Sequence, residues 1–129
     1  DWGDGYENVT ILCSVEIQRR ADDRIPAFLK LPVRHKGILC EPLLEKLVLD
    51  AYLKTGEIAQ VLCGGEQGAD ARVCDFAWVL ELMNQCVNCG VTFRFLRTGT
   101  FFRKGNRIYR IAEEEQEEQA RRAGVDYTP

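Results

Sequence analysis

Residues 59–68 read Ala-Gln-Val-Leu-Cys-Gly-Gly-Glu-Gln-Gly, a short apolar run that stops at two glycines and a carboxylate. Apolar runs of this length, bounded by turn residues, predict buried β-strands. Comparable runs occur at 9–15, 36–40 and 91–96, and the first of these suggests a strand buried on both faces. Because stretches with helical spacing separate the runs, we expect parallel strands joined by right-handed crossovers. The sequence therefore predicts an α/β fold with a mostly parallel sheet.

The segments between these strands predict helices. Residues 18–30 carry apolar side chains at helical spacing, although Pro26 is expected to break or kink this helix. Residues 42–53 predict a loop that contains a short helix. Asp75 is a suitable N-cap for a third helix, and Gly90 suits the left-handed position that follows its last turn.

The last third of the chain predicts a β-hairpin and a helix. Residues 101–103 and 107–111 flank the turn-forming sequence Lys-Gly-Asn at 104–106. Residues 112–123 predict a charged helix with glutamates early and arginines late, as the helix macrodipole favours. No linker divides the sequence, so residues 1–129 are expected to form one α/β domain.

Composition limits the classes of function. The 129 residues carry a formal net charge of −3, which gives no general attraction to nucleic acid. No apolar run approaches the roughly 20 residues that cross a bilayer, and the first residues lack the pattern of a signal peptide. We therefore expect a cytoplasmic protein without membrane contact. Because the sequence does not start with Met, we also expect it to be either processed or part of a longer protein, and we favour the second.

Three predicted strands are each followed by a carboxylate, at Glu16, Glu41 and Glu66. The carboxyl ends of parallel strands meet at one edge of a sheet, which is where chemistry gathers in such folds. Clustered carboxylates can hold a cation, bind an amino group or divide acid and base roles. The alternative is that each forms a salt bridge with a nearby arginine, such as Arg24 or Arg72.

The six cysteines are expected to be reduced thiols, because no secretory signal accompanies them. Cys74, Cys86 and Cys89 could together hold zinc or an iron–sulfur cluster, since the last two form a C-x-x-C pair. However, the helical spacing places Cys86 on an apolar helix face, where a thiol packs as a small hydrophobe. We therefore expect no metal site in this chain.

Basic and aromatic residues interleave between positions 91 and 111, where Arg97, Arg103 and Arg107 alternate with phenylalanine and tyrosine. This combination can bind single-stranded nucleic acid through phosphate contacts and base stacking. A half-buried sheet with aromatics inside and charges outside gives the same pattern. A stand-alone binding module for nucleotide or nucleic acid is therefore the alternative function.

Several short motifs follow one another along the chain, at residues 15–18, 21–26, 40–44, 63–72, 78, 85–86 and 91–93. In this order they resemble the C-terminal half of the radical-SAM-like phage-protein family of unknown function, which occurs in phages and bacteria. The likeness covers about residues 7–100. It implies half of a partial (β/α) barrel with mostly parallel strands, followed here by the C-terminal hairpin and helix.

The resemblance also implies a function, that of the C-terminal portion of a radical-SAM-like enzyme. Its [4Fe–4S] cluster would be held by the missing N-terminal half of the parent protein, because this chain has no upstream cysteine triplet. The strand ends would contact S-adenosylmethionine and substrate, and the likeness places Glu16, Glu41, Gly64, Gly65, Glu66 and Arg72 at this site. No catalytic residue is implied, and the chain alone is expected to be inactive.

Half of a barrel leaves a sheet edge without a partner strand. We therefore expect either a homodimer through the exposed edge or an edge covered by the C-terminal hairpin and helix.

Overall fold

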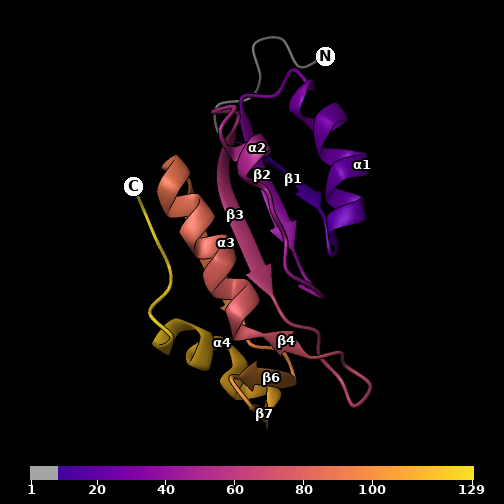
Figure 1. The fold of residues 1–129 in the computed structure, drawn as a ribbon, viewed down its shortest axis with the longest axis vertical. Helices are drawn as coiled ribbons and strands as arrows, with labels where there is room; N and C mark the ends of the chain where they lie inside the picture. Colours follow the sequence, from indigo (N-terminus) through magenta and orange to yellow (C-terminus); the bar gives the residue numbers. More distant parts are fainter. Residues whose placement is uncertain (1–8) are drawn as a thin grey trace.

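The computed structural model describes residues 9–129 and shows a mixed α/β fold built on a four-stranded parallel sheet (Figure 1). Its strands are β1 (Thr10–Ser14), β2 (His35–Cys40), β3 (Ile58–Gly64) and β5 (Thr92–Arg97). They lie in the order β1-β2-β3-β5, and each neighbouring pair is parallel. The prediction of a mostly parallel α/β sheet is confirmed. Residues 1–8, on which the expectation about a signal peptide rested, lie outside the described residues.

The strands lie side by side in the order in which they occur in the chain, so each crossover adds a strand on the same side of the sheet. The helices of these crossovers are α1 (Gln18–Leu29), α2 (Asp50–Leu53) and α3 (Phe76–Cys89). Among the described residues the sheet does not close on itself.

One face of the sheet carries the hydrophobic core. Ile38 pairs with Val61 and Val61 pairs with Phe93, so these side chains form one row across the sheet. All three are fully buried and belong to the same cluster as the buried faces of α1 and α3. Both helices therefore cover the same face, as right-handed crossovers between successive neighbouring strands require.

The opposite face is only half buried within the described residues. Leu39 and Leu62 pair across this face, and both are partly exposed. Leu12, on β1, is 39% exposed. The expectation that residues 9–15 are buried on both faces is therefore wrong, because β1 is an edge strand with one covered and one open face.

The two edges of the sheet differ. Within residues 9–129, β1 pairs only with β2. The other edge, on β5, is covered by the C-terminal segment: Phe93 and Tyr127 exchange two backbone hydrogen bonds of 2.9 Å, and the Phe95 amide donates to Asp126 Oδ1 at 2.8 Å. The sequence predicted that the C-terminal hairpin and helix would cover a sheet edge. In the structure the segment that follows α4 covers the β5 edge instead.

A second, smaller sheet lies at the carboxyl ends of the parallel strands together with α4 (Glu113–Arg122) (Figure 1). It contains β4 (Cys74–Asp75), β6 (Phe101–Lys104) and β7 (Arg107–Arg110), in the order β4-β6-β7. The hairpin β6–β7 turns at Gly105, whose φ of 62° is the left-handed conformation that glycine adopts without strain. The predicted hairpin and charged helix are confirmed. The pairing of β4 with β6 was not predicted, because a strand of two residues is too short to show the alternation of apolar and polar side chains that indicates a β-strand.

Helix α1 is not broken at Pro26, as one form of the prediction had it, since the helix continues through this residue to Leu29. Pro26 cannot donate to the carbonyl four residues earlier, which belongs to Asp22. Both residues are exposed, so water can satisfy that carbonyl. The buried face, which includes Ile25 and Phe28, keeps the helix packed on the sheet.

The predicted ends of α3 are confirmed. The Asp75 carboxylate accepts a hydrogen bond of 2.9 Å from the Ala77 amide, and Gly90 has a left-handed φ of 67°. The helix carries no span that could cross a membrane, and neither does any other helix in residues 9–129.

Replacing Asp75 by Ala removes this N-cap acceptor, and we expect the free energy of unfolding to fall by about 1 kcal/mol in urea denaturation. The matched control is Asp75→Asn, which keeps a capping oxygen but loses the charge that lies 3.7 Å from Arg103. Equal losses in the two variants would show that the ion pair with Arg103, and not the cap, provides the stability.

Candidate functional site

The carboxyl ends of the four parallel strands form the candidate site. Glu16 and Glu41 follow β1 and β2, Gly64 ends β3, and Arg97 ends β5. Backbone hydrogen bonds fix the loops to one another: the Leu43 amide donates to the Gly64 carbonyl at 2.9 Å. The strand-end positions predicted from the sequence are therefore brought to one rim.

An ion pair crosses this rim from β2 to β5. Arg97 Nε lies 3.2 Å from Glu41 Oε2, with β3 between the two strands. The pair passes over Gly64, where an added Cβ would collide with Glu41 Oε2 and lie 3.2 Å from Arg97 Cγ. The absence of a side chain at position 64 is what allows the two charges to meet.

Gly65 allows a second close approach, between the loop after β3 and the backbone of Thr98 and Gly99. A Cβ there would meet the Thr98 carbonyl and lie 2.8 Å from the Gly99 Cα. The loop after β3 is held against this backbone, since the Gly65 amide donates to the Arg97 carbonyl at 3.0 Å. The space beside both glycines is thus filled by the protein's own groups.

Two carboxylate oxygens at this rim lack hydrogen-bond donors. Glu16 Oε2 and Glu41 Oε2 are shielded from solvent, and neither accepts a hydrogen bond. Glu16 Oε2 has Arg24 Nη1 at 3.7 Å, but that nitrogen donates to the Ser14 carbonyl at 2.6 Å. Arg97 Nε, at ion-pair distance from Glu41, also makes no hydrogen bond. An unpaired, shielded acceptor costs about 1–3 kcal/mol, so this arrangement favours a ligand that donates hydrogen bonds.

Glu66 differs from the other two carboxylates, because Arg72 satisfies it completely. The guanidinium donates from Nε and Nη2 to the two carboxylate oxygens, both at 2.9 Å. The Arg72 amide adds a bond of 2.8 Å to Oε1. The hydrogen bonds from Arg72 lower the pKa of Glu66 to about 2. The salt-bridge interpretation therefore describes Glu66 and Arg72 well, and this pair closes the loop after β3.

A polar cavity of about 270 Å³ lies between Arg97 and the first turns of α4. With the Gln67 amide oriented to satisfy both neighbours, its oxygen accepts from Arg97 Nη1 and its nitrogen donates to Glu113 Oε1, each at 3.0 Å. Gln116, which is 1% exposed, also lines the cavity. Its Nε2 donates to the Ile111 carbonyl at 3.0 Å, whereas its buried Oε1 has no donor.

Arg97 and Gln116 are site residues whose role the sequence analysis missed. Arg97 was considered only as a contact for nucleic acid. Gln116 lies in the segment predicted only as a charged helix, yet it is the uncharged position within 113–118. A single uncharged residue inside such a run could have indicated the buried side of the helix.

The three arginines proposed for nucleic acid lie in different surroundings. Arg97 is held at the rim by Glu41. Arg103, on β6, lies 3.7 Å from the Asp75 carboxylate, and Arg107 is exposed on β7. Arg103 and Arg107 belong to the second sheet, whereas Arg97 belongs to the parallel sheet. The three arginines therefore do not lie on one sheet.

The cysteines belong to the hydrophobic core or pack against it. All six are unpaired, and Cys40, Cys63, Cys74 and Cys86 are buried. Burial raises the pKa of the Cys74 and Cys86 thiols to about 12, which disfavours the thiolate that a metal needs. Residues 9–129 contain no group of three or more potential metal ligands.

Comparison with known proteins gives a family but no activity. No curated protein and no solved structure matched the chain. A family model matched residues 2–127, which is nearly the whole chain. The chain therefore belongs to the family described as protein of unknown function (DUF5131).

Proposed function

We propose that this chain is the C-terminal portion of a radical-SAM-like enzyme and that its strand ends contact S-adenosylmethionine and substrate. The observation that carries the proposal is the pair of shielded, donorless oxygens, Glu16 Oε2 and Glu41 Oε2, at the ends of neighbouring strands. S-adenosylmethionine is a cation with an ammonium group, and it therefore offers the hydrogen-bond donors that these two oxygens lack, although each already has an arginine at ion-pair distance.

The sheet topology supports this role. Parallel strands added in chain order on one side of the sheet are the arrangement of a (β/α) barrel, in which chemistry lies at the carboxyl ends. In a barrel the face with Leu39 and Leu62 would be the interior, and this face is half buried here. A missing N-terminal half would pair with β1 and cover this face. A second copy of the chain is the other candidate for the β1 edge.

The residues of this chain do not fit the [4Fe–4S] cluster. No suitable ligand group occurs among residues 9–129, and the buried thiols belong to the hydrophobic core. In the proposal the cluster is held by the upstream half. When bound there with S-adenosylmethionine, the cluster would supply electrons for radical chemistry.

In this proposal the residues of this chain bind and position the ligand. Glu41 and Glu16 accept hydrogen bonds from the ligand, and Arg97 holds Glu41 in place from β5. Glu66 and Arg72 stabilise the loop after β3 and do not contact the ligand, because their hydrogen bonds to each other are already complete. A role as a binding module for nucleotide rests on another surface, the hairpin β6–β7.

The first test uses the full parent gene product, reconstituted with iron and sulfide without oxygen. We expect bound iron and sulfide, and a visible spectrum that shifts when S-adenosylmethionine is added. Glu41→Gln should weaken the binding of S-adenosylmethionine roughly tenfold or more, because a charge-assisted hydrogen bond contributes about 1.5–3 kcal/mol.

The matched control for Glu41→Gln is Asp23→Asn, which removes one exposed carboxylate charge from α1. This variant should bind S-adenosylmethionine as the unaltered protein does. A colourless, iron-free parent protein, or equal affinity in the Glu41 and Asp23 variants, would contradict the proposal.

The second test concerns Glu66, whose assigned role is structural. Its pKa is about 2 in the folded chain and about 4.3 in an unfolded one, so its contribution to stability is complete above the higher value and lost as pH falls toward the lower. Thermal unfolding should show Glu66→Gln to be less stable than the unaltered chain at pH 7. The difference should shrink below about pH 4.5 and vanish near pH 2. A difference that persists at low pH would show that the charge of Glu66 is not its source.

A further inference from the structure

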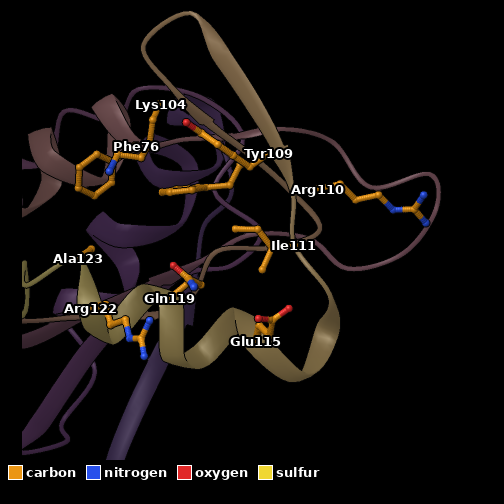
Figure 2. A pocket seen from close by; sticks show the side chains of 10 residues that line it. Phe76, Lys104, Tyr109, Arg110, Ile111, Glu115, Gln119, Arg122 and Ala123 are labelled. Carbon is orange, nitrogen blue, oxygen red and sulfur yellow. The ribbon is translucent and has the colours of Figure 1, made fainter.

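A second open cavity, of about 390 Å³, lies between the hairpin β6–β7, the start of α3 and one face of α4 (Figure 2). Cavities of roughly 300–1,000 Å³ commonly hold small organic ligands. This cavity and the rim cavity are lined by different residues, so what it binds is independent of the strand-end carboxylates.

Aromatic rings from the hairpin and from the start of α3 line one side of the cavity. Phe76 and Phe102 pack edge to face with ring centroids 5.6 Å apart. Tyr109 lines the same cavity and is 42% exposed, and its neighbour Ile108 is 51% exposed. A half-exposed ring beside a cavity offers a stacking surface for a flat ligand.

Cations without anionic partners occur along the same hairpin. Lys104 Nζ lies 5.3 Å from the centroid of the Phe76 ring, and Figure 2 shows the amine over that ring. Within the described part of the chain, Lys104, Arg107 and Arg110 form no ion pair or hydrogen bond, whereas Arg122 is bound to Glu118. Three unpaired cations on one short hairpin, in a chain of net charge −3, indicate a place for an anion.

The opposite wall has different chemistry. Glu115 and Gln119 face the cavity from α4, across from Lys104 and Tyr109 (Figure 2). An amide and a carboxylate can accept hydrogen bonds from the amino groups of a nucleobase, but a carboxylate repels a phosphate. Arg110 points away from the cavity, which places its charge beside the opening. A bound nucleotide would therefore place its base inside the cavity and its phosphates outside, along the hairpin.

We propose that this cavity binds a nucleotide unit of a single-stranded nucleic acid. The base stacks on Tyr109, its edge meets Glu115 and Gln119, and the flanking phosphates contact Lys104 and Arg110. A free nucleotide carries the same base and phosphate and is the other source of this chemistry.

The test is fluorescence anisotropy of the 129-residue chain with labelled DNA and RNA of about eight nucleotides, at about 50 mM salt. We expect binding that weakens as salt rises. Tyr109→Ala should lower the affinity about tenfold through loss of stacking, and Tyr109→Phe should retain most of it. Lys104→Gln should weaken binding for all sequences and reduce the salt slope by about one.

The matched control is Arg121→Gln, which removes the same charge from α4 at a residue outside this cavity. It should leave the affinity nearly unchanged, and circular dichroism checks that each variant is folded. Adenosine monophosphate is added as a competitor. Displacement of the oligonucleotide at similar concentrations would identify a free-nucleotide site, and failure to displace it would support a strand.

Two outcomes would overturn the proposal. One is the absence of binding at low salt to both oligonucleotides and to adenosine monophosphate. The other is an equal loss of oligonucleotide affinity in the Lys104 and Arg121 variants. This result would show that binding depends on the net charge of the chain and not on the cavity. Neither outcome bears on S-adenosylmethionine binding at the rim, because that experiment uses the parent protein and the Glu41 variant.

Discussion

The rim of this protein depends on the absence of side chains at Gly64 and Gly65. The Glu41–Arg97 ion pair spans from β2 to β5 over the first glycine, and the backbone of Thr98 occupies the space beside the second. A methyl group at either position would separate loops that the hydrogen bonds of the rim hold together. Both glycines are therefore required by close packing, and neither has a positive φ.

The helix-covered side of the molecule supports this rim through one buried amide. Gln85 lies on the inner face of α3, where it accepts a hydrogen bond of 2.7 Å from the Leu49 amide and donates one of 2.8 Å to the Leu47 carbonyl. The loop that begins at Glu41 is thereby tied to the third helix. Because a broken buried hydrogen bond costs about 1–3 kcal/mol, the end of this loop at Leu47 and Leu49 is held firmly against α3.

Local pattern was sufficient to predict the elements of the fold and insufficient for their contacts. Apolar runs located the parallel strands, and Asp75 and Gly90 marked the ends of α3 because caps are local. The partner of Arg97 could not be predicted, since Glu41 is distant in sequence and meets it only once β2, β3 and β5 are in register. The exposure of β1 likewise depends on whether a further strand pairs with its free edge, and none does within residues 9–129. A local sequence pattern does not record this.

The strand-end carboxylates illustrate the same limit within the site. Their common position was predictable from the rule for parallel strands, and the structure does bring Glu16 and Glu41 to one rim. Their different states were not predictable. Arg72, six residues beyond Glu66, folds back to satisfy it, whereas the rigid loop geometry leaves an oxygen of each of the other two without a donor.

Helix α4 joins the two candidate sites, because it forms a wall of each. Glu113, Gln116 and Glu117 line the rim cavity, and Glu115, Gln119 and Arg122 line the hairpin cavity. At about 100° per residue these two sets fall on different faces of one helix. Ala120 is buried on the same face as Gln116 and packs into the core, while the Gln116 carbonyl accepts from the Thr98 amide at 3.3 Å. A rotation of α4 that filled one cavity would therefore reshape the other, so the charged helix acts as a shared wall and not as a solvated tail.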